Sequence, residues 1–196
     1  MKTSLCRQLG LTLVEAAATV AVLAATLLLV NSLVTSYLND VNASVTAQQI
    51  RAVGDAAKRY IQDHTAGLVA AATHSTPAVV TVAQLVTAGY LPAGTSGVNN
   101  RRQTMCVLVL EPVTNRLEGL VITEGGDTLD DLTLARVSNA IGAAGGRITS
   151  SSPTTLTGTQ GAWSRPLGGF GTRNCAGNTI SGGPGAGHNV MALWLP

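Results

Sequence analysis

The sequence predicts an α+β protein built around one long N-terminal helix, and three observations support this fold class. Residues 11–63 keep one helical pattern, apolar in the first half and amphipathic in the second. Residues 104–123 alternate as two strands around a turn, which favours an antiparallel hairpin. Residues 127–143 carry the capping and spacing signals of a second helix. We therefore expect a long spine helix packed on a small antiparallel β-sheet, with the second helix in the same head.

The first half of the long helix has the length and composition of a membrane span. Residues 11–34 are almost all Leu, Val, Ala and Thr, and about 20 apolar residues are enough for a helix to cross the hydrocarbon core. Glu15 is the one charged residue in this stretch. Because a carboxylate in hydrocarbon is costly, such a residue marks a functional position with a partner. The sequence therefore predicts a membrane-spanning segment with one functional acid.

A short leader precedes this segment and carries two cations, Lys2 and Arg7. Basic residues beside a span favour the cytoplasmic side of the membrane. The span is too long for the apolar part of a secretory signal, and no small-x-small cleavage site closes it. A plain signal anchor would explain the apolar run, but it would not explain Gly10 directly before the run or Glu15 near its start.

The second half of the helix is amphipathic, as expected of a helix packed on a globular head. Apolar residues recur at three- and four-residue spacing: Leu38, Val41, Val45, Ile50, Val53, Ala57 and Ile61. Charged side chains occupy the other faces. Gly54 is the weak point of the pattern, because glycine costs up to about 1 kcal/mol relative to alanine in a helix interior.

A short helix and a hairpin are expected to follow. Thr81 is a candidate N-cap for the short helix, which Gly89 ends. The hairpin strands are expected at residues 104–110 and 116–123, with residues 111–115 as the turn.

The rest of the head is expected to contain the second helix, a long irregular segment and a last strand. The helix should start at Asp127 or Thr128 and end before Gly145-Gly146. Residues 149–187 are rich in Ser, Thr, Gly and Pro and carry no clear period, so we expect them to be irregular. Residues 188–195 are expected to form the final strand.

Composition and charge argue against a nucleic-acid-binding protein. Hydrophobic residues make up 45% of the chain and charged residues 11%, whereas an average soluble domain is about 25% charged. Twelve basic residues face ten acidic ones, and two of the basic residues lie in the leader. The remaining chain is near neutral and gives no electrostatic attraction to nucleic acid. Aromatic residues are only 3%, which leaves little surface for base stacking.

Two of the three cysteines form a candidate disulfide. Cys6 lies in the leader, whereas Cys106 and Cys175 lie in a head that should face an oxidising compartment. A bridge between them would tie the irregular segment to the hairpin. The alternative is two separate buried thiols, because sequence alone does not place the two sulfurs within bonding distance.

No catalytic, metal or cofactor motif is found in the sequence. The acidic cluster Asp127, Asp130 and Asp131 lacks the alternating oxygen ligands of a calcium loop and coincides with a helix N-terminus, where acids stabilise the helix. The glycine-rich run 182–187 lacks the Lys-Ser/Thr ending of a phosphate loop. The three histidines show no ligand spacing. We therefore expect a non-enzymatic protein without cofactors.

The leader and the start of the span resemble the class III leader of type IV prepilins. The resemblance rests on Gly10-Leu11-Thr12-Leu13-Val14-Glu15 behind a short basic leader. It implies cleavage after Gly10 by a prepilin peptidase and N-methylation of Leu11. It also implies that Glu15, the fifth mature residue, pairs with the N-terminus of a neighbouring subunit. The fold implied is that of a type IV pilin.

The body resembles the N-terminal constant region of PilV-like shufflon minor pilins of conjugative type IVB pili. The matching stretches run in order along the chain: residues 56–61, 76–81 and 85–91, the second hairpin strand into Gly125-Gly126, the helix into residues 145–148, Trp163, and residues 187–190. The resemblance implies a leader at 1–10, a transmembrane and filament-core segment at 11–34, and a periplasmic, later extracellular, head at 35–196. The implied partners are other pilin subunits, the prepilin peptidase and an inner-membrane assembly platform.

Several alternatives stay open at this level. Members of this family continue into a C-terminal region that recognises the recipient cell, whereas this chain stops at Pro196, so we do not expect it to recognise a recipient directly unless a tip is encoded separately. A major pilin and a type II secretion pseudopilin are the nearest alternatives to a minor pilin. A membrane-anchored periplasmic enzyme and an adhesive head are the alternatives from other classes.

Overall fold

The computed structural model describes residues 13–194, so Gly10 and Leu11 lie outside the described residues. The chain divides into two compact units, Met1–Asn39 and Asp40–Pro196. The described part of the first unit is the N-terminal part of helix α1 (Leu13–Asp63). The second unit contains the remainder of α1 and the whole head. A type IV pilin-like α+β architecture, with one long helix and an antiparallel sheet, is thereby confirmed.

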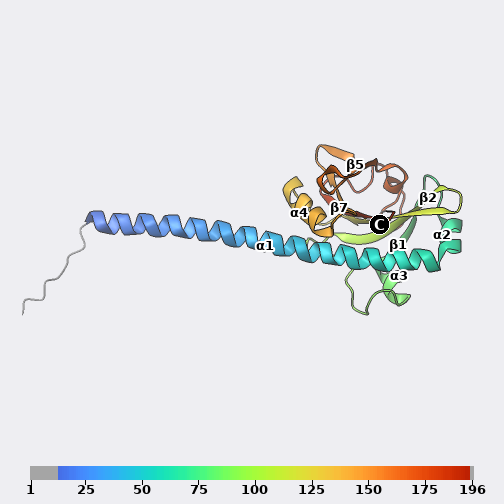
Figure 1. Cartoon of the computed structure of the whole chain (residues 1–196), viewed down its shortest axis with the longest axis horizontal. Coiled ribbons are helices and arrows are strands. Elements are labelled where there is room, and N and C mark those ends of the chain that lie inside the picture. The colour runs from blue at the N-terminus through green and yellow to red at the C-terminus, as the bar shows by residue number, and fades with distance from the viewer. Residues whose placement is uncertain (1–12, 195–196) are drawn as a thin grey trace, which may run out of the picture. The chain divides into compact units, whose positions relative to one another are not determined.

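Up to residue 194, where the description ends, the head contains three further α-helices, two short 3₁₀ helices and seven strands. Figure 1 shows their arrangement beside α1. In chain order these are α2 (Thr65–Ala71), β1 (Ala78–Thr81), α3 (Val82–Thr87), β2 (Thr104–Val113), β3 (Arg116–Glu124), α4 (Asp131–Ile141), β4 (Gly145–Thr149), β5 (Ser152–Gly158), η1 (Thr159–Gly161), β6 (Ser164–Pro166), η2 (Gly168–Thr172) and β7 (His188–Ala192).

All seven strands join one antiparallel sheet in the order β1-β2-β3-β7-β4-β5-β6. The last strand, β7, lies in the middle, between β3 and β4. The predicted hairpin is present as β2 and β3, but it is longer than expected. Its turn is only Thr114-Asn115, where Asn115 adopts φ 62°, and a bulge separates Leu110 from Val113.

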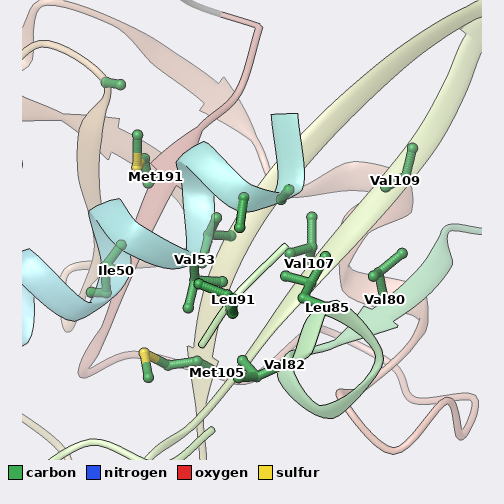
Figure 2. Close-up of a cluster of buried hydrophobic side chains, with 14 of the residues drawn as sticks. Ile50, Val53, Val80, Val82, Leu85, Leu91, Met105, Val107, Val109 and Met191 are labelled. Atoms are coloured by element: carbon green, nitrogen blue, oxygen red, sulfur yellow. The ribbon is translucent and has the colours of Figure 1, made fainter. Parts of the chain in front are cut away.

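One face of the sheet packs on the head part of α1 (Figure 2). Ile50 and Val53 of α1 meet Val107 of β2 and Met191 of β7, and α3 adds Leu85 to the same cluster. The residues of α1 buried in this core are Ala43, Ala47, Ile50, Val53, Ala56 and Ala57. Most of these side chains are small, so the helix lies close to the strands. In Figure 1, α4 and α2 lie near opposite ends of this part of the helix.

The predicted apolar face of α1 is correct for its last turns but wrong further upstream. Ile50, Val53 and Ala57 are buried, whereas Val41 and Val45 remain 40% and 42% exposed. The buried positions there are Ala43, Thr46 and Ala47, which a search for large apolar residues does not select. Val41 and Val45 therefore form an apolar stripe outside the core of the head.

The other face of the sheet encloses a second core. Leu108 of β2, Ile122 of β3, Ile148 of β4 and Leu156 of β5 point into it. The sheet curls around this core. The ion pair between Arg165 on the edge strand β6 and Glu118 on β3 shows this, because β7, β4 and β5 lie between these two strands in the sheet. Arg165 Nη1 and Glu118 Oε2 are 2.6 Å apart. Strand β2 is consequently buried on both faces, as its unbroken apolar sequence implies.

The aromatic residues close the open side of this second core. Trp194 stacks on Phe170, with ring centroids 6.0 Å apart, and meets Trp163 edge-on at 5.8 Å. The guanidinium of Arg165 lies 4.9 Å from the centroid of Trp194, a cation–π distance. Because Arg165 also pairs with Glu118, it links the edge of the sheet, the aromatic cluster and β3.

Three expectations about the head were wrong, and α2 and β1 were not expected at all. Residues 149–187, expected to be irregular, contain β5 and β6 as well as 3₁₀ turns. Helix α4 begins at Asp131, later than expected, and Gly142 ends it with φ 96°. Gly145-Gly146 starts β4 and does not terminate the helix. Both glycines are needed there because a Cβ would collide with Ser138 O at position 145 and with the Trp163 indole at position 146.

Gly54 of α1 lies against side chains of β7 and of the segment directly after it. A Cβ at this position would lie 2.6 Å from Met191 Sδ and 3.4 Å from Leu193 Cδ2. We expect Gly54→Val to lower the free energy of unfolding by about 1–3 kcal/mol, because a larger side chain must displace the buried Met191 side chain from its place in the core. Urea denaturation of the full chain in detergent, followed by circular dichroism, measures the change.

Gly67 provides the matched control for Gly54. It also lies in a helix, α2, but nothing is found within 4 Å of a Cβ built on it. We expect Gly67→Val to change stability by no more than about 0.5 kcal/mol. Equal effects of the two substitutions would show that the distance between α1 and β7 does not limit residue size at position 54.

Candidate functional site

The described part of the N-terminal unit is a helix that exposes an almost entirely apolar surface. The large apolar side chains between Val20 and Val34 are at least half exposed. The hydroxyls of Thr19 and Thr26 donate to backbone carbonyls three and four residues earlier, so these polar groups are satisfied within the helix. Among the described residues, α1 is the one helix long and apolar enough to cross a membrane. This arrangement is compatible with a membrane anchor.

Glu15 lies in the first turn of the described helix. No Asp, Glu, Lys or Arg follows it until Asp40, so its carboxylate is the one formal charge in a stretch of 25 residues, 15–39, that is otherwise apolar or neutral. The processing residues predicted from the sequence, Gly10 and Leu11, lie outside the described residues. Their roles and that of Glu15 stay predictions.

Polar contacts fix the head part of α1 to the loops around it. Arg51 Nε donates to the carbonyl of Ile141 at the C-terminus of α4, at 3.0 Å, where a cation offsets the negative end of the helix dipole. Arg59 Nη2 donates to Tyr90 O, at 3.2 Å. The charged residues that the sequence placed simply on the outer faces of the helix thus anchor the head.

Cys106 and Cys175 form a disulfide in the structure. Cys106 is the third residue of β2 and is fully buried, and Cys175 lies in the segment between η2 and β7. The backbone N–H of Cys175 also donates to Glu124 Oε1 at 2.9 Å. Two bonds of different kinds therefore attach this segment to the hairpin.

The acidic cluster at the start of α4 caps the helix. Asp130 Oδ1 accepts hydrogen bonds from the backbone N–H groups of Thr133 and Leu132, and these bonds, that of Thr133 first, lower the pKa of the Asp130 carboxyl. Asp127 pairs with Arg102, and Asp131 accepts from Ser150. The capping role is confirmed, although the capping residue is Asp130 and not Asp127 or Thr128. The residues that the structure describes hold no group of three or more His, Cys, Asp or Glu side chains able to bind a metal.

His188 begins the central strand β7 and is buried with 2% exposure. Its Nδ1 has no hydrogen-bond partner among the described residues. Burial disfavours the imidazolium and lowers the pKa of His188. The unfolded chain therefore takes up this proton at a higher pH than the folded chain does.

The pH dependence of stability should reveal this histidine. Because the folded pKa is the lower one, the free energy of unfolding should decline as pH falls below about 6.5, the ordinary pKa of histidine. His188→Gln should reduce that decline, as measured by urea midpoints between about pH 7.5 and about pH 5, a range above the titration of Asp130. An equally steep decline in both proteins would mean that His188 does not cause it.

Comparison with known protein families identifies the family of this chain. The N-terminal constant region of the bacterial shufflon protein matches residues 36–181, which is most of the head from the middle of α1 to the segment before β7. The chain belongs to this shufflon family. No curated protein and no solved structure was found to match it. The family is structural and not catalytic, and it is one of pilin-like proteins that associate with other pilin subunits.

The shufflon head contains features that the sequence did not point to. Arg51 and Arg59 were assigned only to the charged faces of the helix, and nothing in their spacing pointed to the carbonyls that they bind. Arg173 lines a cavity formed by four separate segments, and no sequence motif announces such a cavity. Val41 and Val45 could be recognised in the sequence as an apolar stripe, because they continue the helical spacing of apolar residues. They were, however, assigned to the core of the head.

Proposed function

We propose that this shufflon protein is a minor pilin of a type IVB pilus that acts in conjugation or adhesion. The prepilin is held in the inner membrane by residues 11–34 with its head in the periplasm. A prepilin peptidase cuts after Gly10, and Leu11 becomes the N-methylated first residue. An inner-membrane assembly platform then moves the helix into the filament, and the head becomes extracellular.

The observation that carries this proposal is the combination of the shufflon head with an exposed apolar helix. The family match covers the head, and the helix α1 continues from that head into a surface on which the residues from Glu15 to Asn39 are almost all exposed. Such a surface is unfavourable in water. It is stable in lipid before assembly and among neighbouring helices afterwards, so the same residues serve as anchor and then as filament core.

Substitution of Gly10 tests processing directly. We expect Gly10→Val to leave the leader attached, because a branched side chain at the cleaved bond should not fit a peptidase that accepts glycine there. Intact mass spectrometry of the membrane-extracted protein would then show the full leader, whereas the natural sequence should show a chain that starts at Leu11 and carries one methyl group. Gln8→Ala, in the same leader, should be processed normally.

The same measurement separates this proposal from a plain membrane anchor. Complete removal of the leader from the Gly10→Val protein would contradict cleavage by a prepilin peptidase. Copy number in sheared filaments distinguishes the roles within the class. A few copies per filament are expected of a minor pilin, a uniform coat of a major pilin, and none of a secretion pseudopilin.

A further inference from the structure

A cavity of about 390 Å³ opens at the edge strand β1, within the size range of small-molecule sites. Four separate segments form it: the end of α1 and helix α2, strand β1, the start of α3, and the segment after η2. Tyr60, Thr81 and Gln84 contribute polar side chains, of which the Thr81 hydroxyl and Gln84 Oε1 already bond to each other at the start of α3. Arg173 contributes the one formal charge among the lining residues. An aromatic ring, two polar side chains and one cation thus line the same cavity.

Arg173 has no compensating partner among the residues that the structure describes. Its side chain makes no hydrogen bond to the described residues, its Nε is buried without an acceptor, and none of the ion pairs among these residues includes it. Arg165, which is also partly buried, is by contrast paired with Glu118 and lies over the ring of Trp194. A partly buried charge without a counter-ion is costly. An anion in the cavity would offset that cost.

The segment that carries Arg173 is held rigidly. Cys175, two residues further on, is bonded to Cys106, and the N–H of Cys175 donates to Glu124. Thr172 Oγ1 donates to Ser75 O at 3.0 Å. Asn174 closes the turn, because its Oδ1 accepts from Asn178 N and its carbonyl accepts from Gly177 N. The backbone that carries Arg173 is therefore fixed in advance of any ligand, which reduces the entropic cost of binding.

From this geometry we infer that the cavity beside β1 binds a carboxylate carried by a compact polar ligand, with Arg173 as its anchor. Guanidinium is planar and presents parallel donors that match the two oxygens of a carboxylate. The ring of Tyr60 can contact the body of the ligand. Thr81 and Gln84 line the part of the cavity next to the N-terminus of α3. An acidic monosaccharide and the C-terminal carboxylate of a short peptide both have this chemistry.

The test uses the full chain in detergent micelles and the Nε–Hε NMR signal of Arg173, assigned by its absence in Arg173→Gln. The probes are glucuronate and N-acetylglycylglycine, with glucose and N-acetylglycylglycinamide as their neutral counterparts. We expect a saturable shift with at least one carboxylate and none with its neutral counterpart. Arg173→Gln, followed through the backbone signals of Val79 and Ala176, should weaken binding at least about tenfold, as expected for loss of a charge-assisted hydrogen bond.

Two further variants control the result. Arg116→Gln removes an exposed arginine outside the cavity and should bind as the natural protein does. Arg173→Lys keeps the charge without the paired donors and should bind with intermediate affinity. Saturation by glucuronate alone assigns the site to acidic sugars, and saturation by the peptide alone assigns it to peptide termini. The inference is overturned if neither probe saturates below about 10 mM, if the neutral probes shift the signals equally, or if Arg173→Gln binds unchanged.

Discussion

Replacing Cys106 and Cys175 together by alanine should lower the free energy of unfolding by about 4 kcal/mol. The bridge closes a loop across a sequence separation of 69 residues, and a loop of that length restricts the unfolded chain by about this amount. The loop holds β3, α4, β4, β5 and β6, so the constraint acts on most of the head. Because folded domains are typically stable by only about 5–15 kcal/mol, a loss of this size is a large fraction of the total stability.

Reduction of the natural protein provides the control. Urea denaturation of the full chain should show a lower midpoint with a reductant than without one, and the double variant should give the same midpoint under both conditions. The double variant should also lose protease resistance first between residues 173 and 187, since Cys175 holds this segment to β2. A change in stability below about 1 kcal/mol would contradict a structural role for the bridge, because removal of a native disulfide typically costs about 2–5 kcal/mol.

Sequence periodicity predicted the parts of the fold that are locally self-consistent. The long helix, the β2–β3 hairpin and the last strand each carry an apolar pattern of the correct period. Thr81 was found as an N-cap, and the structure adds the reciprocal bond from the Thr81 backbone N–H to Gln84 Oε1, which completes a capping box. These signals depend on residues a few positions apart, so one sequence is enough to find them.

The strands after α4 could not be predicted because the Trp163 indole leaves room only for glycine at two of their positions. A Cβ at Gly146 or Gly158 would lie within 2.7 Å of the Trp163 indole, so two of the strand positions must be glycine. Glycine within a strand is normally a signal against that strand, and here it indicated a helix end and an irregular segment. The cause lies in a contact between residues far apart in sequence, and local patterns do not record it.

The same distinction applies to the candidate sites. Glu15 was conspicuous because a single acid in an apolar run violates a local rule, and the cysteines were conspicuous because few residue types form covalent cross-links. Arg173 was not conspicuous, because an arginine is ordinary in a polar, glycine-rich segment. Its isolation from any counter-ion becomes visible only when the disulfide brings its segment to the edge of β1.

Glu15→Ala should abolish incorporation of the chain into filaments while leaving the head folded. In the proposed assembly, the Glu15 carboxylate lies among apolar helices and is stabilised by the amino terminus of a neighbouring subunit. Two unit charges about 4 Å apart interact by about 4 kcal/mol at an effective dielectric constant of about 20, so even a fraction of this energy would fix the axial position of one subunit against the next. We therefore expect at least a tenfold loss, about 1.4 kcal/mol or more, in the amount of chain recovered from sheared pili relative to membranes.

Two companion variants separate charge from the presence of a polar side chain. Glu15→Gln keeps the size and polarity of the side chain but removes its charge, and it should fail as Glu15→Ala does if the charge sets the position of the subunit. Thr19→Ala changes the next turn of the same helix, where the hydroxyl bonds only to its own backbone, and should assemble normally. Natural levels of Glu15→Gln in filaments would mean that a polar group is sufficient, and natural levels of Glu15→Ala would remove Glu15 from the assembly mechanism altogether.

The membrane-bound amount of each variant is compared in parallel with the filament-bound amount. Loss of the anchor would lower both fractions, whereas loss of the axial contact lowers only the filament fraction.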